Sequence, residues 1–319
     1  MGEGRNINIH TNLCDLLGIE YPLLQGGMAW IAGGRLAAAV SEAGGLGIIG
    51  AGGADPDSLK TEIRIVKKLT SKPFGVNLIM VSPYIDALVD LVIEEKVSMV
   101  TFGAGNPGKY IGRLKEAGIK VIPVVSSVVL GKRLARLGAN ALIAEGTESG
   151  GHIGEMTTMC LVPMLVDAVN IPVIAAGGIA DGRGMAAAFA LGASGVQMGT
   201  RFICAEECGV HPSYQEKVIK AADRDTLVCG SSTGHPVRAI HNRFTRYFIS
   251  CEKSGWPTEE LEKLGAGRYP TAAVKGDMEE GTILAGQICG LVKKVQPAGE
   301  IVKEVIEEAQ GILQRLGGN

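Results

Sequence analysis

Eight short apolar runs, each continuous rather than alternating with polar residues, recur within about 200 residues of this chain. They begin near Tyr21, Leu46, Phe74, Ser98, Lys120, Ala141, Pro172 and Gly195. Each of the first seven is followed by a segment with helical periodicity. Continuous apolar runs are typical of parallel strands that are covered on both faces. Eight such units predict an α/β fold, a closed TIM (β/α)8 barrel in preference to an open doubly wound sheet.

Several residues mark where the predicted helices begin and end. Asp181 is expected to cap the helix RGMAAAFALG, and Gly192 is expected to end it. The helix predicted from Pro83 to Glu95 has proline in its first turn. A final amphipathic helix is predicted over residues 299–316, packed back on the barrel.

The strand and helix rhythm stops after Phe202. Most of the remaining histidine, arginine and aromatic residues lie between there and about Tyr269, without clear strand–helix units. We therefore predict an inserted, mostly helical substrate or lid domain over residues 204–270. The barrel would comprise residues 1–203 and 271–319, where apolar sequence returns in GTILAGQICGLV.

Composition narrows the class of protein. The content is 46% hydrophobic and 20% charged, with a net charge of −2 and mixed signs, so we expect a small or protein-carried ligand and no binding to nucleic acid or membranes. The N-terminal stretch MGEGRNINIHTN has no signal-peptide core, and no run of about 18 apolar residues occurs. The expected location is the cytoplasm.

The seven cysteines are scattered through the chain, as is typical of reduced thiols that fill a core. Cys204 and Cys208 are four residues apart and would share one face of a helix. Two ligands without a nearby second pair fall short of a structural zinc site, so no metal is predicted.

The stretch EGTESGGHIG, from Glu145 to Gly154, combines acidic, hydroxyl and histidine side chains within ten residues. Glu145 ends the sixth predicted strand, and His152 lies in the loop before a helix that begins at Thr157 and Thr158. Loops that follow barrel strands converge on one mouth, where the reactive groups of such barrels lie. His152 is therefore a candidate catalytic residue, and a structural histidine is the alternative.

Glycine-rich loops follow strands seven and eight. AAGGIADGRG places Gly177 and Gly178 where strand gives way to helix, so that N–H groups can approach an anion at the helix N-terminus. QMGTR adds Gln197, Met198, Gly199 and Thr200 after strand eight. These two loops are the usual phosphate site of such barrels. Each loop alone would be weak evidence for a phosphate site, since glycine also marks tight turns and the sequence contains no Walker-type phosphate loop.

Two further strand ends favour a flat heterocyclic ligand. QGGMAW presents backbone amides at Gly27, Met28 and Ala29 beside apolar side chains. Asn77, at the end of the third run, offers a donor and an acceptor inside the mouth. A buried amide that satisfies loop backbone is the alternative for Asn77.

These motifs resemble an FMN-dependent group that contains the nitronate monooxygenases and the type II, FabK-type enoyl-acyl-carrier-protein reductases. The similar segments are QGGMAW, SEAGGLGIIG, KPFGVN, TFGAGNP, EGTESGGHIGEMTT, IPVIAAGGIADGRG, VQMGTRF, GHPVRAI and AGQICGLV. The resemblance implies a TIM barrel with a small helical insertion, FMN at its mouth, and a homodimer.

The resemblance also implies roles for particular residues. Phosphate would lie on Gly177, Gly178, Gly199 and Thr200. The ribityl chain and ring would be surrounded by Gly27, Met28, Ala29, Asn77, Glu145, Gln197 and Met198. His152 matches the functional histidine of the group. The pattern E-G-x-x-x-G-G-H-I-G, with Ile153 where many nitronate oxidisers have arginine, favours the reductase.

For a reductase of this kind, NADH or NADPH reduces FMN and is replaced by a trans-2-enoyl thioester on acyl carrier protein. Hydride then reaches the β-carbon through flavin N5, as in fatty acid elongation, and His152 would deliver a proton or polarise the substrate. The basic residues of VRAIHNRFTRY are usually solvated surface. A sharper hypothesis is that some of the residues Arg238, His241, Arg243 and Arg246 meet the acidic carrier protein or its phosphopantetheine arm.

Three alternatives stay open. A nitronate monooxygenase would oxidise alkyl nitronates with oxygen and without NADH. A nucleotide dehydrogenase of the IMP type needs a cysteine on the loop after strand six, where this chain has His152 and where Cys160 falls within the next helix. A flavin-binding sensor without catalysis is the third.

Overall fold

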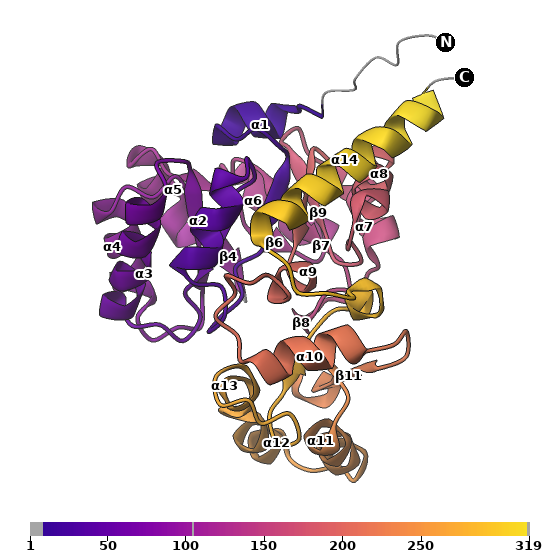
Figure 1. Cartoon of the computed structure of the whole chain (residues 1–319). Coiled ribbons are helices and arrows are strands. Elements are labelled where there is room, and N and C mark those ends of the chain that lie inside the picture. Colours follow the sequence, from indigo (N-terminus) through magenta and orange to yellow (C-terminus); the bar gives the residue numbers. More distant parts are fainter. Residues whose placement is uncertain (1–8, 104, 318–319) are drawn as a thin grey trace.

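A computed structural model describes residues 9–103 and 105–317 of the chain (Figure 1). All eight predicted apolar runs form parallel strands. They are β1 (Leu23–Gln25), β2 (Gly47–Gly50), β3 (Phe74–Ile79), β4 (Met99–Gly103), β5 with β6 (Lys120–Val121 and Val124–Val125), β7 (Leu142–Glu145), β9 (Val173–Ala176) and β10 (Gly195–Met198). The first eight residues of the N-terminal stretch that we judged for a signal peptide lie outside the described residues.

The strands close into a barrel through two seams. One sheet has the order β2-β3-β4-β5 and the other β1-β10-β9-β7-β6. At the first seam, Leu46 N donates to Leu23 O at 2.9 Å and Gln25 N donates to Leu46 O at 3.0 Å. At the second, residues 120–125 form one run interrupted at Pro123, which has no N–H to donate. Ile122 N still donates to Val100 O at 2.9 Å, and Ile143 N to Pro123 O at 3.0 Å. The predicted TIM (β/α)8 barrel is confirmed.

A buried side-chain amide reinforces the first seam. Gln25 is fully buried, and its Nε2 donates to Ile48 O at 3.2 Å while its Oε1 accepts from Ile48 N at 3.1 Å. Nε2 also donates to Gly26 O. Because β1 is only three residues long, these side-chain bonds supply pairing that the short backbone ladder lacks.

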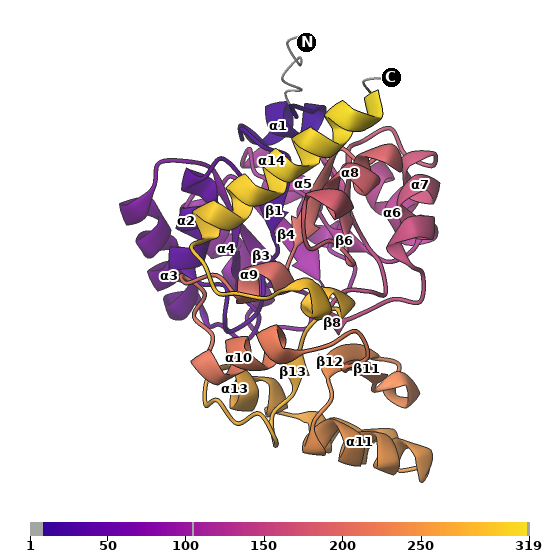
Figure 2. The ribbon, with the colours of Figure 1, turned by 45° about the vertical axis from the view of Figure 1, so that its right-hand side comes forward.

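Helices surround the strands as the sequence predicts. They are α2 (Gly34–Glu42), α3 (Pro56–Leu69), α4 (Ile85–Glu94), α5 (Gly108–Glu116), α6 (Val128–Arg136), α7 (Thr158–Val166) and α8 (Gly182–Ala190). The predicted C-terminal helix is confirmed as α14 (Ala298–Gly317), which packs on α8 and α2 and so fills the eighth place in the ring (Figures 1 and 2). Helix α1 (Asn12–Leu17) packs Leu13 and Leu17 against the interior side chains at the amino ends of the strands.

The predicted helix boundaries are mostly right. Asp181 caps α8 by accepting from the N–H groups of Arg183 and Gly184, and Gly192 follows its end with a φ of +90°. The prediction for Pro83 is wrong, because α4 begins at Ile85 after the N-cap Tyr84, so the proline precedes the helix. The residue before a helix start tolerates proline equally well, since it needs no helical N–H.

The segment after β10 lies over the carboxyl ends of the barrel strands (Figure 2). It contains α9 (Thr200–Ile203), α10 (Pro212–Lys220), β11 (Thr226–Cys229), β12 (Val237–Ile240), α11 (Arg243–Lys253), α12 (Thr258–Gly265) and α13 (Arg268–Ala273). After it, β13 (Ile283–Leu284) and a short 3-10 helix, η2 (Gln287–Leu291), return to the barrel. The domain division at residues 204–270 stays a prediction.

The sequence does not predict the small sheet that joins this segment to the barrel. Strands β11, β12 and β13 pair antiparallel, and β12 also pairs with β8 (Gly151–His152), which lies within the loop after β7. A two-residue strand carries no periodicity, which is why the pattern misses it. The insertion therefore forms backbone hydrogen bonds directly with the barrel loop that contains His152.

The cysteines are free thiols, and all except Cys160 are buried. The prediction that Cys204 and Cys208 share a helix face is wrong, because α9 ends at Ile203. In the described part of the chain, no helix combines the length and apolarity needed to cross a membrane.

Replacing Gln25 by leucine tests the first seam. Leucine would leave the N–H and C=O of Ile48 buried without these partners, so the free energy of unfolding should fall by about 2–4 kcal/mol. Chemical denaturation measures this change. Gln287→Leu, at an exposed position, is the control and should stay within about 0.5 kcal/mol. Equal stability of the two variants would contradict the role of Gln25.

Candidate active site

A cavity of about 620 Å³ opens at the carboxyl ends of the strands, beneath the insertion. The structure brings every predicted site residue to its wall. These residues are Gly27, Met28, Ala29, Asn77, Glu145, His152, Gly177, Gly178, Gln197, Met198, Gly199 and Thr200. They come from strands one, three, six, seven and eight of the barrel, which only closure brings together.

The loop after β9 presents free amides to the cavity. Gly177 and Gly178 have φ values of +89° and +74°, which favour glycine. A Cβ on Gly177 would lie 2.9 Å from Gly146 O. Within the described residues, no acceptor takes the N–H of Gly178 or of Ile179. Two such donors on a left-handed turn form a concavity suited to a phosphate group.

The first N–H groups of helix α8 already have acceptors, and the anion position expected beside Gly177 and Gly178 stays a prediction. Asp181 accepts from the first free N–H groups of α8, and Glu308 accepts from Gly182 N at 2.8 Å. Two carboxylates therefore already occupy the end of the helix. An anion would meet the loop amides before Asp181 instead.

The loop after β10 is tied to the C-terminal segment. Gly286 N donates to Thr200 Oγ1 at 2.9 Å, which leaves the hydroxyl hydrogen of Thr200 available for a ligand. A Cβ on Gly199 would meet nothing closer than Met28 Sδ at 3.7 Å. The backbone of Gly199 is thus open to the cavity beside the loop of Gly178.

Asn77 is held with its amide nitrogen free. Thr101 Oγ1 donates to Asn77 Oδ1 at 2.7 Å, and Nδ2 donates to no described residue. The alternative that Asn77 satisfies loop backbone is therefore wrong. A Cβ on Gly27 would lie 2.3 Å from Asn77 Cβ, so glycine is required where strands one and three approach. The N–H groups of Gly27 and Met28 also have no described acceptor.

Glu145 is an unusually weak acid at the cavity wall. Removal from water raises its pKa to about 7. The nearby Ser149 hydroxyl opposes the rise, although Ser149 Oγ makes no hydrogen bond of good geometry and is buried without a partner. No described cation pairs with Glu145, so the carboxyl group is partly protonated near neutral pH.

His152 projects from β8 into the cavity and is held by the insertion. It pairs with Val237 of β12, and Ile153 N donates to Pro236 O at 3.1 Å. The side chain is exposed to the open cavity. Partial removal of the imidazole from water lowers the pKa of His152, and the nearby imidazole of His235 lowers it further. The imidazole is therefore neutral near pH 7.

Sequence reasoning missed three polar groups around this loop. Glu148 accepts from Thr158 N at 3.0 Å and from Thr158 Oγ1 at 2.9 Å, and so caps α7. Ser149 and Glu148 both line the cavity. Their acidic and hydroxyl side chains within EGTESGGHIG were the available signal. Tyr269, from α13, lines the cavity too and gave no signal, because it follows the barrel repeats.

The basic residues of VRAIHNRFTRY do not all lie on one surface, and a role of some of them in meeting the carrier protein stays a prediction, since Arg243 and Arg246 are exposed. Arg238 is buried, and its Nε donates to Thr147 O at 3.0 Å. Arg243 pairs with Glu280, and His241 Nδ1 lies 3.1 Å from Asp225 O. Strand β12 directs the side chain of Arg238 inward, toward the loop of His152, where its hydrogen bond to Thr147 O stabilises the loop backbone.

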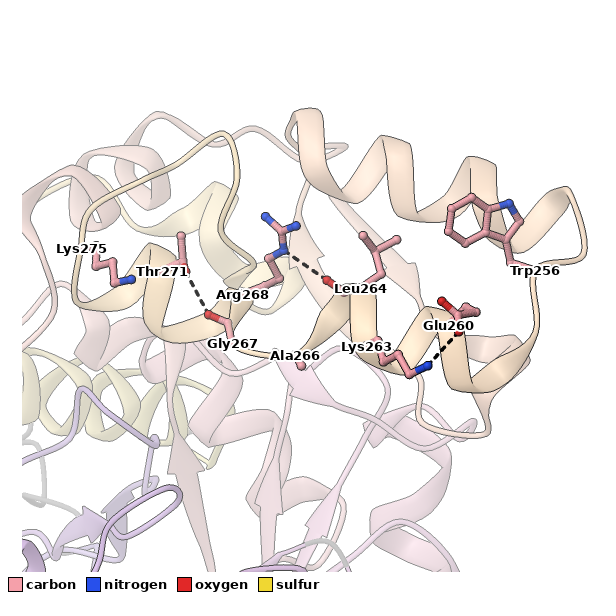
Figure 3. A pocket seen from close by; sticks show the side chains of 9 residues that line it. All are labelled: Trp256, Glu260, Lys263, Leu264, Ala266, Gly267, Arg268, Thr271 and Lys275. Carbon is pink, nitrogen blue, oxygen red and sulfur yellow. Dashed lines mark hydrogen bonds and ion pairs between the residues drawn. The ribbon is translucent and has the colours of Figure 1, made fainter.

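A second hollow, of about 600 Å³, lies on the outer face of α12 and α13 (Figure 3). Trp256, Lys263, Arg268 and Lys275 line it, and Lys263 Nζ pairs with Glu260 Oε1 at 2.8 Å. None of the predicted site residues is there. The barrel cavity is therefore the candidate active site.

Comparisons with known proteins agree with this geometry. The family profile described as nitronate monooxygenase matches residues 10–86 and 81–308. The structure of FabK from Thermotoga maritima is similar, with 53% identity, a TM-score of 0.94, and coverage of 97% of this chain and 99% of that one.

Two curated relatives are similar over nearly their whole length. A "probable nitronate monooxygenase" of Staphylococcus saprophyticus is 35% identical, covering 97% of this chain and all of that protein. A (3aS,4S,5R,7aS)-5-hydroxy-7a-methyl-1-oxo-octahydro-1H-indene-4-carboxyl-CoA dehydrogenase of Rhodococcus jostii is 33% identical, covering 97% of this chain and 98% of that protein.

Replacing Gly178 by valine tests the phosphate cradle. A branched side chain at positive φ strains the turn and blocks approach to its amides, so FMN affinity should fall by more than about 100-fold. Fluorescence titration of FMN measures this. Gly118→Val is a matched control, since Gly118 has a φ of +78°, open space around it and a place at the opposite end of the barrel. Unchanged affinity in Gly178→Val would contradict the assignment.

The raised pKa of Glu145 predicts a pH dependence of stability in the FMN-free protein. Because the folded state holds this proton more tightly than the unfolded state, the contribution of Glu145 to stability is lost as pH rises from 4.5 to about 7. Glu145→Gln removes the effect, so its stability relative to the original chain should be about 2–3 kcal/mol higher at pH 8 than at pH 4.5. Denaturation at both pH values tests this. The exposed Glu259→Gln variant should show no such change between the two pH values. If the stability difference between Glu145→Gln and the original chain were equal at both pH values, the raised pKa of Glu145 would be refuted.

Proposed function

The chain belongs to the nitronate monooxygenase family, and we propose that within it the protein is an FMN-dependent enoyl-acyl-carrier-protein reductase. NADH or NADPH would reduce trans-2-enoyl thioesters in fatty acid elongation. The observation that carries this proposal is the 53% identity to FabK of T. maritima over 97% of the chain. The R. jostii relative supports it, because its name describes an enzyme that acts on a CoA thioester.

The residues at the mouth fit FMN. Unpartnered amides at Gly178 and Ile179, with Gly177, Gly199 and Thr200 beside them, suit its phosphate. Unpartnered donors at Gly27, Met28 and Asn77 suit the edge of its ring. Further residues proposed around the ring and ribityl chain are Ala29, Glu145, Gln197 and Met198. When bound, FMN supplies the redox chemistry that passes reducing equivalents from NAD(P)H to the thioester.

His152 is the proposed acid for the α-carbon of the substrate. Because the lowered pKa leaves the imidazole mostly neutral near pH 7, the minor protonated form would deliver the proton, and that form is a stronger acid than an ordinary imidazolium. The β8–β12 pairing fixes its backbone, so the imidazole does not depend on a mobile loop for its position. The insertion lies over the cavity, and a substrate bound beneath it would displace water near the reacting carbons.

A nitronate monooxygenase is the second candidate. The S. saprophyticus relative favours it by name, at 35% identity. The same cavity and histidine would serve an alkyl nitronate and oxygen, with no need for NADH. Ile153, in the position after His152, favours the reductase.

The remaining assignments concern partners and compartment. An acyl carrier protein is the proposed carrier of the thioester, and a homodimer is the proposed assembly. The cytoplasm is the proposed compartment, which buried and unpaired thiols support.

Anaerobic mixing tests the function. FMN-loaded protein is reduced with NADH and then mixed with crotonyl-pantetheine thioester or with an alkyl nitronate, while flavin absorbance is followed. We expect bleaching by NADH and recovery of colour with the enoyl thioester. Failure of NADH to bleach the flavin, together with turnover of the nitronate in oxygen, would instead select the monooxygenase.

Replacing His152 by alanine tests the proton donor. The variant should bind FMN normally and be bleached by NADH at the original rate, but reduce crotonyl thioester about 100-fold or more slowly. The exposed His235→Ala is the comparison and should retain most of the activity. Normal enoyl reduction by His152→Ala would reject the assignment.

A further inference from the structure

The floor and the roof of the cavity are formed by different parts of the chain. Strand ends of the barrel, such as those at Asn77 and Gln197, form the floor. The C-terminal segment and the insertion cover it with Leu284, Ile288 and Tyr269. A ligand enclosed beneath this roof meets mostly apolar side chains there. Tyr269 is the exception, because it carries a hydroxyl group.

Helix α13 presents its two sides to different spaces. Arg268, Thr271 and the following Lys275 face the outer groove (Figure 3). Tyr269, between them in sequence, lines the catalytic cavity instead. Arg268 is held by Glu280 Oε2 at 3.2 Å and by Leu264 O at 3.1 Å. The helix carrying Tyr269 is therefore anchored from its outer side.

The hydroxyl group of Tyr269 has no partner among the residues that the structure describes. Its neighbour Tyr214 is fully buried and donates to Leu284 O at 2.8 Å. Tyr269 makes no hydrogen bond with any described residue. It is also absent from the polar side-chain atoms that are shut away from solvent without a partner, which among the described residues are Ser149 Oγ, Arg201 Nη1 and Gln296 Nε2. The hydroxyl group of Tyr269 is therefore accessible, on a residue that lines the cavity.

Burial raises the pKa of Tyr269, and the neighbouring Cys208 adds to the rise. The phenol thus stays protonated at any working pH and is a neutral hydrogen-bond donor. Leu284, which pairs with β12 as His152 does, also contributes to this roof. The roof therefore presents an O–H donor in addition to the imidazole of His152.

We propose that Tyr269 is a further catalytic residue, whose hydroxyl group donates a hydrogen bond to the thioester carbonyl oxygen of the substrate. This role rests on the proposed enoyl reductase function. A hydride equivalent that originates from NAD(P)H forms the new C–H bond at the β-carbon. The C=C π electrons then move toward the carbonyl oxygen, where Tyr269 stabilises the negative charge without losing its proton. A proton from His152 completes the α-carbon, leaving a saturated thioester and NAD(P)+.

Tyr269→Phe tests the proposal, since it removes the oxygen and keeps the ring. We expect enoyl reduction to slow by about 10- to 100-fold, with FMN content and the rate of bleaching by NADH unchanged. Tyr247→Phe, at an exposed position on α11, is the matched control and should behave as the original chain. Circular dichroism confirms that each variant is folded.

Vibrational spectroscopy gives a readout independent of turnover. The carbonyl stretch of bound butyryl-pantetheine thioester should lie at lower frequency in the original chain than in Tyr269→Phe, because a hydrogen bond weakens the C=O bond. Equal rates or equal frequencies in the two proteins would overturn the role of Tyr269 while leaving the reductase intact. Failure of the original chain to reduce crotonyl thioester would overturn the proposed function, and this role with it.

Discussion

Closure of the parallel barrel is the constraint on which the site depends. Every strand ends at the same rim, where the backbone leaves the ladder and its N–H groups lose their strand partners. Glycines at positive φ, such as Gly178, turn those N–H groups toward the cavity instead of toward other protein groups. The seam at β1 and β2, reinforced by Gln25, joins strand two to strand one, which also pairs with strand eight, and so completes the rim.

The insertion acts on the same rim through backbone pairing. Strand β12 of the insertion pairs with the loop of His152, and Gly286 of the C-terminal segment that follows the insertion donates to Thr200 Oγ1. Arg238 adds a buried hydrogen bond to the loop at Thr147. Both the proposed acid and the proposed phosphate loop are thus held by the part of the chain that covers them. The segments that cover the cavity therefore also fix the positions of the residues proposed for binding and catalysis.

Much of this arrangement follows from sequence pattern, and the rest does not. The eight apolar runs locate the strands because burial on both faces leaves a strong local signal. The site residues at the rim, from Gly27 to Thr200, can be located from the sequence as well, because a position at the end of a barrel strand is enough to place a residue at the rim. The β8–β12 pairing, the inward Arg238 and the cavity-facing Tyr269 depend on contacts between distant segments, which no local pattern encodes. The second carboxylate at the end of α8 was missed for the same reason, since Glu308 lies on α14.

A crystal structure of the FMN-loaded protein tests the central claim most directly. The account predicts the phosphate within hydrogen-bond distance of the N–H groups of Gly178 and Ile179, and the flavin ring between the strand ends and the roof at Leu284. FMN bound in the groove of α12 and α13, or a phosphate held away from these loop amides, would contradict it.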